Sequence, residues 1–174
     1  MYNIDQCIKG FFHDGIPFYK INLSSEIVKI IDEKNRTFLE LYGLPNLNKH
    51  FIIEDLEFFY SIKIEIMNNN YYIIIGKDSM GSICIDIPTG EIISIDMESN
   101  YKKYFINSSL SDFFVCLYLY NRFCINNKTE LDEKEQLKLY NLMQNLFNQV
   151  NSNILDSESN WWSEIIEPLE YGIF

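Results

Sequence analysis

The chain has 174 residues, of which 47% are hydrophobic and 16% aromatic, a composition that excludes an intrinsically disordered protein. With 25 acidic against 14 basic residues, its formal net charge is −11, which disfavours binding to nucleic acid or to anionic membranes because both are negatively charged. A chain of this length buries enough surface to fold as a single domain, residues 1–174, without a metal or a disulfide for stability.

The cysteines are far apart in the sequence and none belongs to a CxxC pair: Cys7, Cys84, Cys116 and Cys124. This spacing favours reduced structural thiols over a zinc site, and we predict no cofactor. The N-terminus lacks the basic and apolar regions of a secretory signal, and no apolar run approaches the ~18 residues that a membrane helix needs. We therefore expect a cytoplasmic protein.

Residues 1–23 mix aromatic residues with Gly-Ile and Pro-Phe pairs, and we expect a short extended entry segment there. From Ser24 the pattern becomes that of one helix, because a serine cap is followed by apolar residues at helical spacing. Gly43 and Pro45 end this helix, since glycine accepts the left-handed cap and proline cannot extend the chain helically.

The middle of the chain predicts an antiparallel meander. Four isoleucine-rich segments are joined by connections too short for a parallel crossover: 61–66, 71–76, 82–87 and 91–96. Segment 51–60 is ambiguous between strand and helix. The expected fold class is α+β, with a central sheet of about four to six strands flanked by helices.

Alternation within the last two of these strands predicts one apolar and one more polar sheet face. The apolar side, facing the helices, is made of isoleucines: Ile83, Ile85, Ile87, Ile93 and Ile95. We expect Asp86, Ser94 and Asp96 to share the other face, which meets water or a partner.

The second half of the chain is predicted to be helical. Segment 107–124 begins with a cap at Asn107 or Ser108, and segment 129–151 places acidic residues in its first turn, where the helix dipole favours them. The tail, 161–174, reads as a short helix perturbed at Pro168 and closed near Gly172. Its tryptophan pair, Trp161 and Trp162, is open to two interpretations: an interface anchor, or core with at least one ring buried.

No catalytic motif is complete. The segment GKDSMG (76–81) lacks the GK[ST] ending of a phosphate-binding loop and is followed by a strand, so it is predicted to be a hairpin loop. His13 beside Asp14 has no marked nucleophile, and His50 has no partner at helical spacing. Asp86 and Asp96 could act in acid–base or metal chemistry only if the fold brought them together. We predict no catalytic, cofactor or metal site.

Four stretches resemble, in the right order, the SUKH superfamily of immunity proteins, and its fourth subgroup most closely: FLELYGLP, IGKDSMGSICIDIPTGEIISID, NSSLSDFFVCL and WWSEIIEPLEYGIF. The resemblance covers about residues 36–174 and leaves out 1–23. It implies an α+β domain with a central antiparallel sheet and no catalytic residue set. It also implies a role in bacterial polymorphic toxin systems, where such proteins bind and block a cognate toxin.

The leading functional hypothesis is thus a cytoplasmic immunity protein that is not an enzyme. Its acidity suits a toxin with a basic cleft, for instance a nuclease or a nucleic-acid deaminase. The candidate partner-binding residues are acidic or polar and lie in the meander: Asp78, Asp86, Glu91, Ser94 and Asp96. The alternative is a regulatory or scaffold binding module of the same fold, and a third is an enzyme that uses Asp86 and Asp96.

Overall fold

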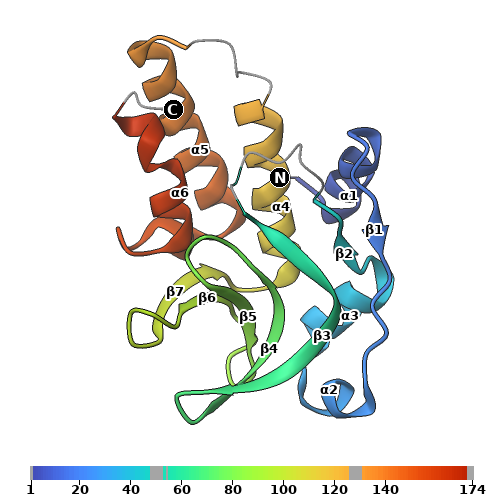
Figure 1. The fold of residues 1–174 in the computed structure, drawn as a ribbon. Coiled ribbons are helices and arrows are strands. Elements are labelled where there is room, and N and C mark those ends of the chain that lie inside the picture. The colour runs from blue at the N-terminus through green and yellow to red at the C-terminus, as the bar shows by residue number, and fades with distance from the viewer. Residues whose placement is uncertain (1, 48–52, 54, 126–130, 172–174) are drawn as a thin grey trace.

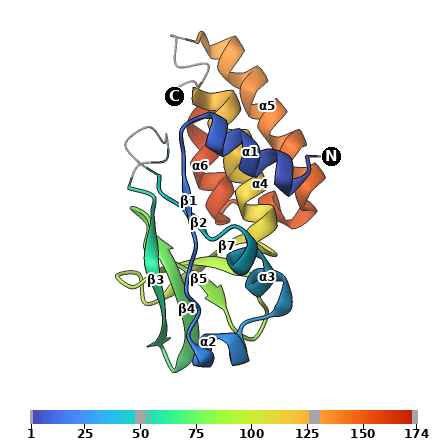
Figure 2. The same cartoon turned by 90° about the vertical axis from the view of Figure 1, so that its right-hand side faces the viewer.

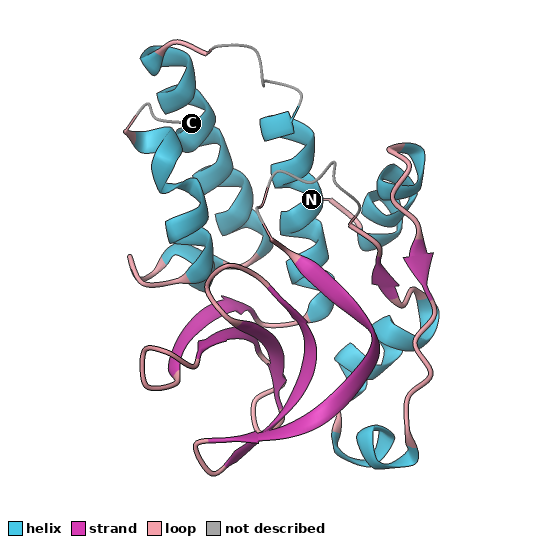
Figure 3. Ribbon diagram, in the orientation of Figure 1, coloured by secondary structure: helices cyan, strands magenta, loops and turns pink. Residues whose placement is uncertain are grey.

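The computed structural model describes residues 2–47, 53, 55–125 and 131–171. A curled five-stranded sheet occupies one part of the molecule, and helices gather over one end and one side of it (Figures 1 and 3). The strands follow one another in space as in sequence, all antiparallel: β3 (Glu57–Met67), β4 (Asn70–Lys77), β5 (Ser82–Asp86), β6 (Ile92–Asp96) and β7 (Lys102–Asn107). The predicted α+β meander is confirmed, and β7 supplies a fifth strand in a segment to which no strand had been assigned.

The helices and two short strands complete the fold. They are α1 (Ile4–His13), β1 (Phe18–Tyr19), α2 (Ser25–Ile30), α3 (Glu33–Leu41), β2 (Leu44–Pro45), α4 (Leu110–Tyr120), a π-helical turn (Asn121–Ile125), α5 (Glu133–Val150), a 3₁₀ turn (Ser152–Leu155) and α6 (Trp161–Glu170). Helices α4, α5 and α6 lie side by side beyond one end of the sheet, and α2 lies at the opposite end (Figures 1 and 2). Within the described residues, no helix is long and apolar enough to cross a membrane.

The expectation of an extended N-terminal segment was wrong, because residues 4–13 form α1. The Asn3 side chain accepts a hydrogen bond from the backbone N–H of Asp5 and so caps the helix. Cys7, Ile8 and Phe11 are buried on one helical face, and α1 packs on α4. The 3–4 spacing of these residues was visible in the sequence.

The single helix predicted from Ser24 to Gly43 is in fact two helices. Ile31 has an extended backbone (φ −72°, ψ 139°), and the Asp32 side chain then caps α3 by accepting from the N–H of Asn35. Ser24 caps α2 as predicted, and Gly43 adopts φ +79° at the end of α3. The apolar pattern of the two helices is nearly in phase, so periodicity alone did not reveal the break.

The predicted cap of the segment 107–124 was displaced by one or two residues. Ser109 caps α4 by accepting from the N–H of Asp112, whereas Asn107 is the last residue of β7 and is fully buried. Helix α5 starts with a complete capping box between Asp132 and Glu135. The suggestion that the tail helix ends near Gly172 lies outside the described residues.

The core on the helix side of the sheet combines aliphatic residues with a group of packed aromatic rings. Trp161 and Trp162 are both fully buried, with ring centroids 4.7 Å apart. The indole N–H of Trp162 donates to the Asn107 side chain (2.9 Å). These two tryptophans are therefore core residues that fix α6 to β7, and neither is available as an interface anchor.

A buried asparagine joins three segments beneath the sheet. Asn35 is 1% exposed; its amide donates to the carbonyl oxygen of Gly90 (2.7 Å) and to Asp32, and its oxygen accepts from the N–H of Leu110 (2.7 Å). Helix α3, the β5–β6 turn and the first turn of α4 are thus tied together by one side chain.

The predicted division of the sheet into an apolar and a polar face was wrong for β6. Ile83 pairs with Ser94 and Cys84 with Ile93, so Ile93 and Ile95 lie on the opposite side from Ile83 and Ile85. Both faces are apolar, because the second one carries its own buried cluster: Met67, Tyr72, Ile74, Cys84, Ile93 and Ile95. Alternation within one strand divides its residues between two faces. It does not show which of these faces lies on the same side of the sheet as the apolar face of the neighbouring strand.

Candidate functional site

The five residues predicted to bind a partner do not form one patch. Ser94 is fully buried on the helix-facing side, and its hydroxyl has no hydrogen-bond partner within the described part of the chain. Asp86 and Glu91 flank the β5–β6 turn, whereas Asp78 and Asp96 lie at the other end of these strands, near α6 and in the β6–β7 turn. The expectation that Asp86, Ser94 and Asp96 share an exposed face is therefore wrong.

Asp78 is occupied by internal hydrogen bonds. Its Oδ1 accepts from the backbone N–H of Met80 (2.9 Å) and Gly81 (2.8 Å), and its Oδ2 accepts from the indole N–H of Trp161. Burial raises the pKa of this carboxyl above its usual range, although the hydrogen bonds act in the opposite direction. Asp78 therefore fixes the β4–β5 loop to α6.

Asp86 belongs to a small charged cluster on the second face of the sheet. Its side chain is 13% exposed and lies 3.9 Å from Lys103 Nζ, which is also 5.0 Å from the centroid of the Tyr72 ring. Lys103 and Tyr72 are on β7 and β4, with two strands between them, so their contact indicates that this face is concave. The Tyr72 hydroxyl and the Asp86 carboxylate raise the pKa of Lys103.

Asp96 is a half-buried carboxylate at the end of β6 that accepts hydrogen bonds only from its own turn, among the described residues. It accepts from the backbone N–H groups of Glu98 and Ser99 in the β6–β7 turn, at 2.9 and 3.1 Å. Hydrogen bonding from Ser99 lowers the pKa of Asp96. The carboxylate is ionised at neutral pH and stabilises its own turn, while remaining partly exposed.

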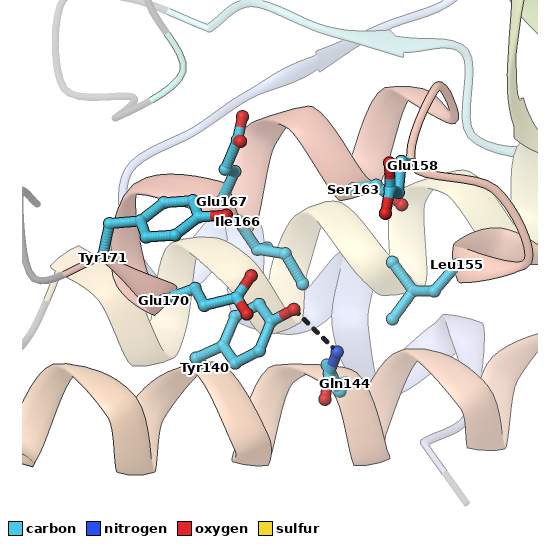
Figure 4. A pocket seen from close by; sticks show the side chains of 9 residues that line it. All are labelled: Tyr140, Gln144, Leu155, Glu158, Ser163, Ile166, Glu167, Glu170 and Tyr171. Carbon is cyan, nitrogen blue, oxygen red and sulfur yellow. Dashed lines mark hydrogen bonds between the residues drawn. The ribbon is translucent and has the colours of Figure 1, made fainter.

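An acidic pocket of about 390 Å³ lies between α5 and α6 (Figure 4). Carboxylates, two tyrosines and an amide line much of it: Glu158, Glu167, Glu170, Tyr140, Tyr171 and Gln144. Gln144 donates to the Tyr140 hydroxyl (2.9 Å), and burial together with the Glu170 carboxylate raises the pKa of Tyr140. Carboxylates next to aromatic rings suit a cationic side chain, because the ring faces and the carboxylates both attract positive charge.

A second cavity is an apolar groove between α2 and the end of the β3–β4 hairpin, with a volume of about 650 Å³. Its walls are mainly aliphatic and aromatic: Ile30, Ile64, Ile66, Tyr71 and Ile87. Glu26 and Lys29 of α2 form its charged rim.

The residues first considered for metal or thiol chemistry are not gathered in either cavity. All four cysteines are free and buried, and burial raises the pKa of Cys7 to about 11 and that of Cys124 to about 12. The expected structural role of these thiols is therefore supported. In the described part of the chain, no group of three His, Cys, Asp or Glu side chains is placed to hold a metal ion; His13 is exposed at the end of α1, and His50 is outside the described residues.

The sequence profile of the SUKH-4 immunity protein family matches residues 29–168. The chain belongs to this family. No curated protein and no solved structure matches it. The matched range includes α3, the whole five-stranded sheet and nearly all of α6, so the resemblance seen in the four sequence stretches is confirmed over most of the chain.

The sequence alone revealed neither the acidic pocket nor the apolar groove of this SUKH-4 protein. The acidic pocket combines residues of two antiparallel helices, and only the pairing of α5 with α6 brings Tyr140 near Glu167 and Glu170. The groove had a signal in the sequence, because isoleucine alternates with polar residues in segment 61–66 and so places Ile62, Ile64 and Ile66 on one face of a strand. That pattern did not indicate that this face of the strand extends beyond the helices that cover the rest of it.

Proposed function

We propose that this SUKH-4 protein is a cytoplasmic immunity protein that binds a cognate toxin and neutralises it by occlusion. The observation that carries the proposal is family membership, since the profile of an immunity protein family matches residues 29–168. That membership indicates a protective role against a toxin, and the identity of the toxin and the place where it is bound belong to the proposal.

Inhibition by binding, without catalysis, agrees with the chemistry of the described surface. The two cavities offer carboxylates with tyrosines in one case and aliphatic side chains in the other. These are the groups with which one protein holds another: buried apolar anchors and complementary charge.

The toxin is proposed to be positively charged, as a basic nuclease or a nucleic-acid deaminase would be. A net charge of −11 accelerates encounter with a basic surface at low ionic strength. The partly exposed carboxylates predicted from sequence, Asp86, Glu91 and Asp96, are proposed to contribute to this attraction, together with the α5–α6 pocket. Asp78 and Ser94 act inside the fold and are left out of the contact surface.

Co-expression tests the function directly. The toxin encoded beside this gene is induced in a sensitive host with and without this protein, and growth is expected to recover only when the protein is present. A variant truncated before α5 serves as a control for expression burden. No rescue, or rescue by the truncated variant, contradicts the proposal and favours a regulatory or scaffold module of the same fold.

A further inference from the structure

The apolar groove between α2 and β3 is an exposed continuation of the protein core. Ile66 pairs with Tyr71 and Ile64 with Ile73 across the β3–β4 hairpin, and Ile73 is fully buried beneath the helices. The same sheet face is therefore covered at Ile73 and open to solvent two residues further along each strand, where α4 and α6 no longer reach (Figures 1 and 2).

The open part exposes large apolar side chains that gather at one place. Ile66 is 63% exposed, Tyr71 57% and Ile30 37%, and all three line the same groove. Contiguous exposed apolar surface is unfavourable in water and marks binding sites more often than chance. Isolated exposed leucines or methionines need no such explanation.

The groove runs beside a sheet edge. Strand β3 is the first in the order of the five-stranded sheet and in it pairs with β4 only, over the described residues. Short strand β2 lies near β3, while the groove is at the far end of β3, around Ile64 and Ile66. A strand laid along that end would place alternate side chains into the groove, between β3 and α2.

We propose that this groove receives an extended, apolar segment of the toxin, added as a strand along the open end of β3. This inference rests on the proposed function, and it names the surface on which binding takes place. The charge favours the toxin over a second copy of this chain, because two copies each carry −11 and repel one another, whereas a basic partner is attracted. Lys63 and Glu65, which form an ion pair on the other side of β3, place charges at the edge that discourage unselective strand pairing.

The test compares Ile66→Asp with a matched control, Leu41→Asp. Leu41 is 62% exposed and Ile66 63%, so each substitution adds one negative charge at an equally accessible apolar residue, and only one of them lies in the groove. With the purified toxin domain encoded beside this gene, Ile66→Asp is expected to raise Kd at least about tenfold, while Leu41→Asp changes it less than about twofold. Equal affinities of the two variants would overturn the inference.

A second variant and a backbone measurement protect the test from a folding defect. Ile30→Asp, on the opposite wall of the groove, is expected to weaken binding by a similar factor, and thermal unfolding of each variant confirms that it is folded. Hydrogen exchange in the complex should show slower exchange of amides in residues 62–67. Unchanged affinity of Ile30→Asp, or no added protection in these residues, contradicts strand addition.

The remaining outcomes separate this inference from the proposed function. If the wild-type protein binds the toxin and Ile66→Asp binds equally well, the function stands and the groove is the wrong surface. If the wild-type protein does not bind the toxin, the proposed function and the groove as its binding surface are both rejected. If light scattering shows a wild-type dimer that Ile66→Asp converts to monomer, the groove holds a second copy, and the toxin segment is rejected.

Discussion

Replacing Asn35 with alanine is expected to destabilise the fold far more than its size suggests. Alanine leaves the backbone N–H of Leu110 and the carbonyl oxygen of Gly90 buried without their partners, at sites where the hydrogen bonds are both 2.7 Å. A buried polar group without a partner costs about 1–3 kcal/mol. Two such groups give an expected loss of about 2–6 kcal/mol in the free energy of unfolding. For a domain of this size, the melting temperature should fall by at least about 4 °C.

Urea unfolding followed by tryptophan fluorescence measures this loss, since Trp161 and Trp162 are buried in the core. Asn145→Ala is the control, because Asn145 is exposed on α5 and alanine favours the helix; its stability should change by less than about 0.5 kcal/mol. A loss below about 1 kcal/mol for Asn35→Ala would refute the assignment of Asn35 as a tie between three segments.

The isosteric Asn35→Asp tests the same contacts through pH. An aspartate carboxylate can still accept from the N–H of Leu110, but it cannot donate to the carbonyl oxygen of Gly90. It would also lie against the carboxylate of Asp32, which in the wild-type protein is 2.6 Å from the side-chain nitrogen of Asn35. Two carboxylates this close raise the folded-state pKa of the pair above the unfolded value. The contribution to stability is then greatest at low pH and is lost as pH rises through the folded pKa, so this variant should be least stable at neutral pH.

Three further predictions use contacts elsewhere in the fold. Gly43→Ala should lower the free energy of unfolding by more than about 2 kcal/mol in urea titrations, because an added Cβ would overlap a backbone carbonyl oxygen of β1. Gly15→Ala is the control: Gly15 has a similar φ, but a Cβ added there would have no described atom within 4 Å, so this substitution should cost about 1 kcal/mol. Burial raises the pKa of Asp78 above its ordinary 3.8, so the protonated carboxyl favours the folded state at low pH. The difference in free energy of unfolding between wild type and Asp78→Asn should therefore shrink as pH rises through the folded-state pKa. A difference that does not vary with pH would contradict this. Trp162→Phe should cost about 1–3 kcal/mol by calorimetry, since it leaves the buried Asn107 oxygen without its donor, and an unchanged melting temperature would show that the indole N–H is dispensable.

The parts of the fold that were predictable from sequence are those governed by neighbouring residues. Turn residues and strict alternation located four strands of the meander, acidic first-turn residues with helical spacing located α5, and the apolar pattern of the tail located α6. The break at Ile31 was missed because the apolar spacing continues across it, and because the start of α3 is also held by Asn35, whose partners Gly90 and Leu110 are 55 and 75 positions away. Long-range contacts of this kind override a local pattern, and nothing in the periodicity of residues 24–43 indicates them.

The site was less predictable because it depends on how strands are matched to one another. Polarity placed Ser94 on an outer face, but the β5–β6 register turns it inward opposite Ile83. The isoleucines Ile93 and Ile95 then face a concave side that closes over them, so an apolar residue there is also buried. A one-residue difference in the relation between two strands exchanges their faces, which is why Asp86 and Ser94 lie on opposite faces of the sheet. Asp96 is distant from Asp86 for another reason, because each ends its own strand and the two strands are antiparallel.

Charge and apolar surface should act on different steps of toxin binding. The carboxylates Glu167 and Glu170 of the α5–α6 pocket are exposed to solvent, so ions screen them, and their effect is on the rate of encounter. The groove at Ile66 and Tyr71 removes apolar surface from water only after the partner has docked, so its effect is on the rate of dissociation. Glu167→Gln together with Glu170→Gln should therefore slow association and flatten its dependence on salt, whereas Ile66→Asp should mainly accelerate dissociation. If both kinds of variant changed only dissociation, the acidity of the chain would serve solubility and the groove alone would account for recognition.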